Sequence, residues 1–165
     1  MNLNLTQITT LTAALGAATF GGVLFAFSTF VMPGLDASPA PAAIATMQQV
    51  NRAAPRSLLA FDMVATLVLC LAVAVLAVVH LRRDGGVGSV LLLVGALLYV
   101  ASFAITAIYH IPRNNAFDDV VANGPHAVQA WHDYAKPWEL WNHVRAGAAL
   151  AGAASMLVGL LVRTA

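Results

Sequence analysis

A chain of 165 residues that is 60% hydrophobic and 9% charged lies outside the composition of soluble domains, in which about 25% of residues are charged. A net charge of +1 without a basic run excludes the electrostatic footprint of a nucleic-acid-binding protein, so we expect no nucleic acid partner. The only cysteine, Cys70, excludes an intramolecular disulfide and a thiolate metal cluster.

Four apolar stretches, residues 5–31, 58–79, 87–108 and 144–162, predict four membrane-spanning helices. Each is close to or above the roughly 20 helical residues that cross a hydrocarbon core about 30 Å thick. The first stretch has no basic residue before it and is too long for the apolar core of a signal peptide, so we expect a retained span. We predict an all-α, integral membrane four-helix bundle, a single domain over residues 1–165 in a bacterial cytoplasmic membrane.

The connections between these stretches differ in length and character. In the first, Pro33 and Gly34 predict the end of the first helix, and residues 42–53 predict a short amphipathic helix. The second is a tight basic turn whose Gly85 and Gly86 make the second and third spans antiparallel neighbours. The third is long and contains an amphipathic segment around residues 126–134.

Small residues recur every four positions in the first and fourth spans. The spacing of Ala151, Ser155 and Gly159 in the fourth span, like that of Ala13, Ala17 and Gly21 in the first, is typical of helices whose backbones approach closely in lipid. We therefore expect these faces to pack inside the bundle.

In a bundle of four spans, the first and third connections emerge on the same side of the membrane. The polar residues of the chain therefore converge at one end, which holds Asn51, Arg52, His110, Asn114, Asn115, Asn142, His143 and Arg145. Lys and Arg number five at this end and three at the other, but several of the five have candidate site or packing roles, so the positive-inside rule leaves the orientation open.

Asp62 and Arg145 are the most costly residues of the predicted spans, because a charge at membrane depth costs a few kcal/mol. We expect the two side chains within salt-bridge or one-water reach. The pair has two interpretations: an ion pair that ties the second helix to the fourth, or a site in which Asp62 supports catalysis by orienting a histidine or binding substrate.

His110 ends the third span and His143 precedes the fourth, so we expect both imidazoles near one spot as catalytic residues. General acid or base catalysis and a purely structural pair both stay open. A third alternative is iron or copper held by His110, His143 and Asp62, since two histidines and a carboxylate form the facial triad of non-haem iron oxygenases. The helical i, i+3 or i+4 spacing of metal-binding histidines is missing, so we expect no cofactor.

Four asparagines accompany the histidines: Asn51, Asn114, Asn115 and Asn142. Amides beside an apolar pocket suit the binding of a carbonyl or phenol, or the stabilisation of an oxyanion. The alternative is that Asn115 or Asn142 caps a short helix.

Four motifs carry a family resemblance: GVLFAFSTFVMP at 22–33, MQQVNR at 47–52, HIPRNN at 110–115 and WELWNHVR at 138–145. In this order they resemble the anthrone oxygenase-like family of small membrane proteins, long catalogued as a domain of unknown function. The resemblance covers almost the whole chain and implies a four-helix membrane protein. By analogy with fungal members it also implies oxidation of an anthrone to an anthraquinone with molecular oxygen.

Carried onto this chain, the resemblance implies a set of substrate-binding residues around His110 and His143: Asn51, Arg52, Asn114, Asn115, Trp138, Trp141, Asn142 and Arg145. Arg113 stands where family members often have leucine, which puts a charge beside the expected site.

We therefore expect a membrane oxidoreductase, a monooxygenase of an anthrone-like or phenolic hydrophobic substrate. Its other partners are membrane lipid and molecular oxygen, and a homo-oligomer stays open. The carbon to be oxidised is acidic, so a histidine base and an oxyanion clamp could suffice without a cofactor. The alternative is a non-enzymatic membrane protein that binds a lipid or a hydrophobic small molecule.

Overall fold

The structure is a computed structural model that describes residues 4–83 and 85–164, and this part of the chain is helical without strands. Four helical segments are long and apolar enough to cross a membrane: Leu5–Asp36, Leu58–Arg83, Val87–Phe117 and Ala127–Arg163. The predicted all-α membrane bundle is confirmed.

The elements in chain order are α1 (Leu5–Ala26), the π-helical turn η1 (Phe27–Val31), α2 (Met32–Asp36), α3 (Ala40–Ala53), the 3₁₀ turn η2 (Ala54–Arg56), α4 (Leu58–Arg83), α5 (Val87–Ile105), the π-helical turn η3 (Thr106–His110), α6 (Ile111–Phe117) and α7 (Ala127–Thr164). The turn between α4 and α5 uses positive φ angles at Gly85 and Gly86, which a side chain would disfavour.

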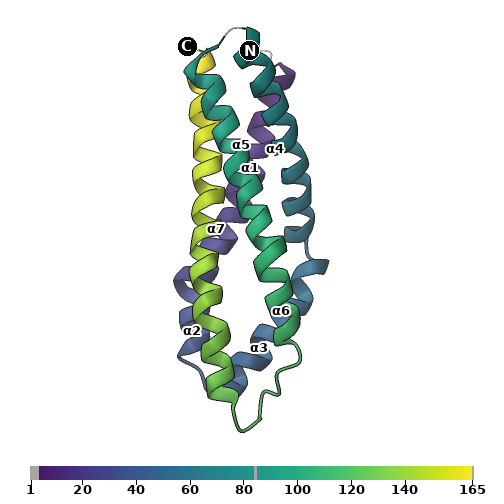
Figure 1. Ribbon diagram of the computed structural model, residues 1–165, viewed down its shortest axis with the longest axis vertical. Helices are drawn as coiled ribbons and strands as arrows, with labels where there is room; N and C mark the ends of the chain where they lie inside the picture. Colours follow the sequence, from purple (N-terminus) through teal and green to yellow (C-terminus); the bar gives the residue numbers. More distant parts are fainter. Residues whose placement is uncertain (1–3, 84, 165) are drawn as a thin grey trace.

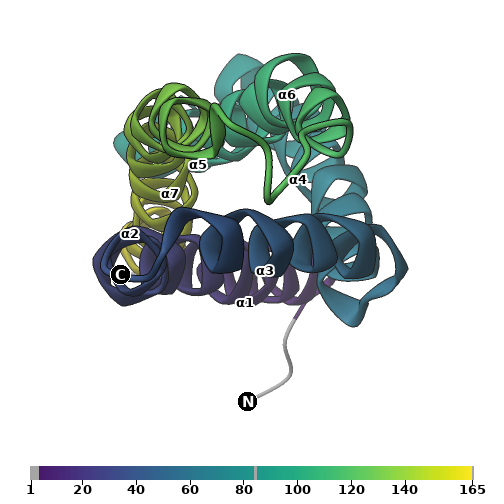
Figure 2. The same ribbon diagram turned by 90° about the horizontal axis from the view of Figure 1, so that it is seen from below.

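The long helices form an antiparallel ring in which α7 and α4 each pack against both α1 and α5. Figure 1 shows the two chain ends and the α4–α5 turn at one end of the bundle, with α2, α3 and α6 at the other. Seen along the bundle in Figure 2, α3 lies across this second end. The first and third connections therefore meet there, as predicted.

Glycines bring α5 and α7 into close contact. A Cβ atom on Gly95 would lie 2.7 Å from the carbonyl oxygen of Gly152, and one on Gly88 would lie 2.8 Å from that of Gly159. The next contact comes seven residues further along α5, where Ser102 donates a hydrogen bond to the carbonyl oxygen of Arg145. The contact between the two helices therefore repeats every seven residues. The small-residue face predicted for the fourth span is therefore partly wrong, because Ala151 is exposed and Gly152 makes the contact.

The first and third helices run beyond their predicted ends because a π-helical turn comes just before the proline of each, Pro33 in α2 and Pro112 in α6. Proline has no N–H for the carbonyl four residues earlier, and its ring clashes with that carbonyl. The N–H of Met32, just before Pro33, reaches back five residues to the oxygen of Phe27, and that of Ile111, just before Pro112, reaches the oxygen of Thr106. The predicted end at Pro33 was therefore wrong.

The fourth helix also begins far earlier than the apolar stretch 144–162. It starts at Ala127, takes in the amphipathic segment around 126–134 and contains Pro137. The short helix of the first connection begins at Ala40 rather than 42. Asn142 consequently lies inside α7 and is not a helix cap. The prediction started the helix too late because the first turns of α7 are polar and hydrophobicity alone did not reveal them.

Candidate functional site

A cavity of about 360 Å³ lies at the polar end of the bundle, a size within the usual range for small-molecule sites. Its wall is mostly apolar, with Phe20, Phe27, Met63 and Trp138 among the larger side chains. Its polar groups are Asn51, Thr106, His110, Asn114, Asn115 and Arg145. Helices α1, α3, α4, α6 and α7 and the turns between them supply these side chains, so the cavity depends on the whole fold.

His110, at the end of η3, is the histidine of this cavity. Its side chain is buried, at 1% exposure, and its ring stands edge to face against Trp138 with ring centroids 5.1 Å apart. Neither ring nitrogen meets the geometry of a hydrogen bond with another described residue, although the backbone of Trp141 lies near enough to interact with the imidazole. Buried polar groups are nearly always paired. His110 is therefore a buried, largely unpaired imidazole in the wall of the cavity.

Arg145 also lines the cavity and is held by neutral partners. Its Nε and Nη2 donate to Oδ1 of Asn142 at 2.9 and 2.7 Å, and its Nη1 donates to Thr106 Oγ1 at 3.1 Å. The amide nitrogen of Asn142 in turn donates to the carbonyl oxygen of Leu24 and to Ser28 Oγ. Asn142 is fully buried and positions Arg145 rather than lining the cavity.

The ion pair expected between Asp62 and Arg145 is not formed. Asp62 accepts a long hydrogen bond from Thr66 Oγ1 at 3.4 Å and lies beside Gly16 of α1. The rotation of α4 that brings Thr66 against Gly16 turns Asp62 toward α1, and Asp62 does not line the cavity.

Two of the predicted amides join a network with aromatic side chains. Oδ1 of Asn114 accepts from the hydroxyl of Tyr134 at 2.9 Å and from Nε1 of Trp138 at 3.0 Å. Asn51 donates from its amide to the same Tyr134 hydroxyl at 3.2 Å. This network fixes α3 and α6 against α7. Asn115 lies exposed at the edge of the cavity, with no side-chain hydrogen bond that would make it a cap.

Besides Asp62 and Asn142, three more predicted site residues lie outside the cavity. The side chain of His143 is 54% exposed and lies 3.9 Å from Glu139 Oε1, one helical turn away. Arg52 pairs with Asp118 at 3.3 Å, and Trp141 is 41% exposed beside Tyr109. The two histidines do not meet, because in α7 the positions of Glu139 and His143 face away from the bundle.

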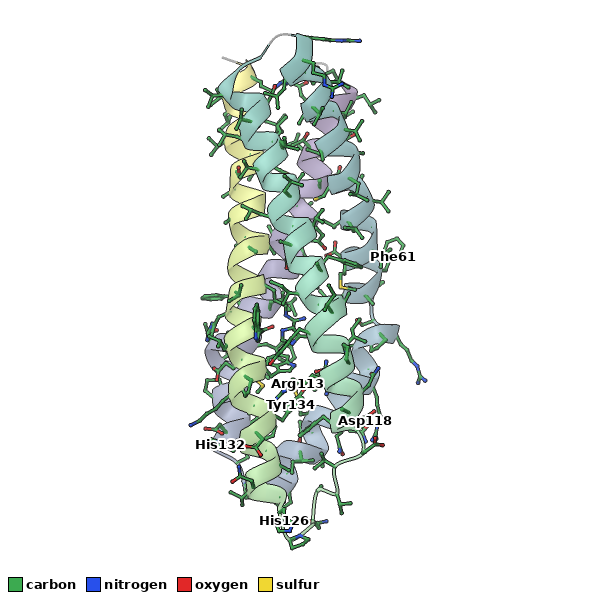
Figure 3. The ribbon with its side chains drawn as sticks, viewed as in Figure 1. Phe61, Arg113, Asp118, His126, His132 and Tyr134 are labelled. Carbon is green, nitrogen blue, oxygen red and sulfur yellow. The ribbon has the colours of Figure 1, made fainter. Side chains whose placement is uncertain are left out.

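Arg113 does not line the cavity either. Pro137 has no N–H for the carbonyl of Asp133, one turn earlier, and the Arg113 guanidinium donates to that carbonyl instead. Figure 3 shows Arg113 and Tyr134 close together in the same part of the bundle, and the guanidinium lies 5.8 Å from the centre of the Tyr134 ring. Arg113 therefore supplies a hydrogen-bond donor to the backbone carbonyl of Asp133, which Pro137 leaves without one.

Thr106, Tyr134 and Ser28 belong to the site and were not predicted. For Thr106 the sequence does hold a signal, since Ser102, Thr106 and His110 recur every four residues within an apolar stretch. The roles of Tyr134 and Ser28 can be recognised only once the positions of Asn114 and Asn142, to which they are hydrogen-bonded, are known.

The candidate iron or copper ligands His110, His143 and Asp62 do not come together. Within residues 4–83 and 85–164, no group of three His, Cys, Asp or Glu side chains is arranged to hold a metal ion.

Fold and cavity together define a helical membrane protein with a mostly apolar cavity at one end of the bundle. The sequence matches the family model described as anthrone oxygenase over residues 56–155, more than half of the chain. The protein therefore belongs to the anthrone oxygenase family. Searches of curated proteins and of solved structures give no match.

Proposed function

We propose that the protein is a membrane oxidoreductase that oxidises an anthrone-like or phenolic hydrophobic substrate with molecular oxygen. The observation that carries the proposal is the buried His110 imidazole, without a side-chain partner among the described residues, in the wall of an apolar cavity of a chain from this family. Of the two histidines expected as the base, we retain His110, because His143 does not line the cavity.

The proposed reaction converts the methylene carbon of the substrate and one oxygen molecule into a ketone and water. His110 takes a proton from this carbon, whose acidity comes from delocalisation of the resulting charge onto the substrate's carbonyl oxygen. The electron-rich anion forms a carbon–oxygen bond with molecular oxygen. Loss of the second proton from this carbon and cleavage of the oxygen–oxygen bond then release water. One oxygen atom stays in the product, so the scheme balances without a cofactor.

The test measures oxygen uptake and quinone absorbance with a hydroxyanthrone and purified protein in lipid nanodiscs. His110→Ala should lower the rate about a hundredfold or more, the lower end for loss of a general base. His143→Ala, the matched control, should stay within a factor of a few. Normal turnover by His110→Ala would remove the proposed base. Activity lost on chelation and restored by iron or copper would overturn the cofactor-free scheme.

The second candidate is a non-enzymatic protein that binds a lipid or hydrophobic molecule in the same cavity. It is favoured by two lining residues, Val64 of α4 and Ile111 of α6, which are about half exposed, so that the cavity is open between these helices. Apolar molecules dissolved in the bilayer could therefore reach the cavity from the side. Saturable binding of the anthrone without any oxygen uptake would favour this candidate.

A further inference from the structure

The guanidinium of Arg145 is a buried charge without a counter-ion. Its side chain is 6% exposed, and its contacts are the neutral groups Asn142 and Thr106 and the face of the Trp138 ring, 5.4 Å away. The acidic side chains of the described residues form no ion pair with it. A charge inside a membrane bundle normally has a partner, because burying it alone is costly.

The guanidinium also keeps donors for a ligand. Arginine has five N–H groups. Three of them are used, by Nε and Nη2 to Asn142 and by Nη1 to Thr106. One N–H on each terminal nitrogen has no acceptor among the described residues, and Arg145 lines the cavity. Two N–H groups of the guanidinium therefore remain without an acceptor in the described part of the chain.

We propose that Arg145 is an anion anchor and that the cavity binds its hydroxyaromatic ligand in the ionised form, with the charged oxygen on the guanidinium. The proposal deepens the proposed function and rests on it for the aromatic nature of the ligand. Binding a neutral phenol would leave the guanidinium uncompensated, whereas a phenolate or enolate neutralises it. The aromatic walls at Phe20, Phe27 and Trp138 suit a planar body attached to a single charged oxygen.

The neighbouring histidine is consistent with this arrangement. His110 and Arg145 both contact the Trp138 ring, so a ligand that reaches one lies close to the other. Arg145 therefore fixes the oxygen of the ligand, while His110 remains free to exchange protons with its carbon. Asn142 is a positioning residue in this scheme, since it orients the guanidinium without lining the cavity.

The experiment uses a dihydroxyanthraquinone dye, whose colour changes when its phenol ionises, and its dimethyl ether as the analogue that cannot ionise. Both are oxidised already, so binding is measured without turnover. At a pH where the free dye is neutral, the dye bound to protein in nanodiscs should show the ionised band. It should bind about 10- to 100-fold tighter than the ether, the range for a hydrogen bond to a charged group.

Three variants separate the anchor from general misfolding. Arg145→Met should lose the ionised band and bind dye and ether equally. Asn142→Asp gives the guanidinium a built-in carboxylate partner, and it should lose the preference for the dye while still binding the ether, which shows an intact cavity. Arg56→Gln removes an exposed cation at the same end of the bundle and should behave as wild type.

Neutral dye bound to the wild-type protein would overturn the proposal. So would an ionised band that persists in Arg145→Met, or one that disappears only in His110→Ala. Ionised dye binding without any oxidation of anthrones would leave the anchor standing while the oxygenase proposal fails. Unchanged oxidation by a folded Arg145→Met variant would remove the anchor alone.

Discussion

Asn142→Leu tests whether the buried amide holds the fold together through Arg145. The substitution keeps the side chain's size but removes the acceptor of two hydrogen bonds from the guanidinium. Hydrogen bonds to a charged group contribute about 1.5 to 3 kcal/mol each, so the variant should lose about 3 to 6 kcal/mol of unfolding free energy. Asn142→Leu combined with Arg145→Met removes the stranded charge as well and should recover the part of the loss that comes from it, because replacing both partners of a buried polar pair is often close to neutral. The carbonyl of Leu24 and the hydroxyl of Ser28 lose the Asn142 donor in both variants, so their cost is the same in each.

The assay is reversible unfolding in mixed detergent micelles, followed by tryptophan fluorescence. Gln129→Leu is the control in the same helix, because it removes an exposed hydrogen bond to Asp133 and should change stability by less than about 0.5 kcal/mol. A double variant no more stable than Asn142→Leu alone would refute the reasoning, since the cost would then not come from the stranded guanidinium.

Two further predictions concern the helix contacts. Gly152→Ala should destabilise the bundle by about 1 to 3 kcal/mol, because its Cβ would meet the carbonyl oxygen of Gly95 at 2.8 Å. Gly147→Ala is the control, since its Cβ would have nothing within 4 Å and the change should be neutral or stabilising. Equal melting temperatures of the two variants would contradict this prediction. Arg113→Leu should cost about 1 to 3 kcal/mol by leaving the Asp133 carbonyl unpaired. Adding Pro137→Ala supplies the missing N–H and should reduce that cost, and an unreduced cost in chemical unfolding would disprove the role of Arg113.

The sequence was sufficient to predict the membrane bundle because lipid imposes a strict rule. A spanning backbone must satisfy its own hydrogen bonds, so about 20 apolar residues indicate a helix whatever its neighbours. With four such helices, the connectivity alone placed the polar connections at one end. Six of the predicted site residues lie together at the cavity for this reason: Asn51, His110, Asn114, Asn115, Trp138 and Arg145.

Helix rotation could not be predicted in the same way. Whether Asn142 or its neighbour His143 faces inward depends on the phase of α7, and the apolar stretch that defined the fourth span began only after both residues. Asp62 was paired with Arg145 because both are charged. The rotation of α4 is set instead by the close contact of Thr66 with Gly16. Such a contact depends on how the two helices pack and cannot be read from the residue types alone.

Pro112→Ala is expected to make the protein more stable and to slow the proposed oxidation. In α1 and in α5 the same order occurs, a π-helical turn, one residue and then a proline, and the two turns contribute Phe27, Thr106 and His110 to the cavity. Alanine at 112 restores the N–H for Ile108, so the turn can return to an α-helix, which favours stability by up to about 3 kcal/mol. A π-helical turn holds one residue more than an α-helical turn, so this return rotates His110 relative to Arg145.

Pro41→Ala is the control, because a proline in the first turn of α3 removes no helical hydrogen bond. Oxygen uptake and unfolding are measured on both variants, and a Pro112→Ala protein that is more stable yet fully active would show that the π-helical turn does not position His110 for the reaction.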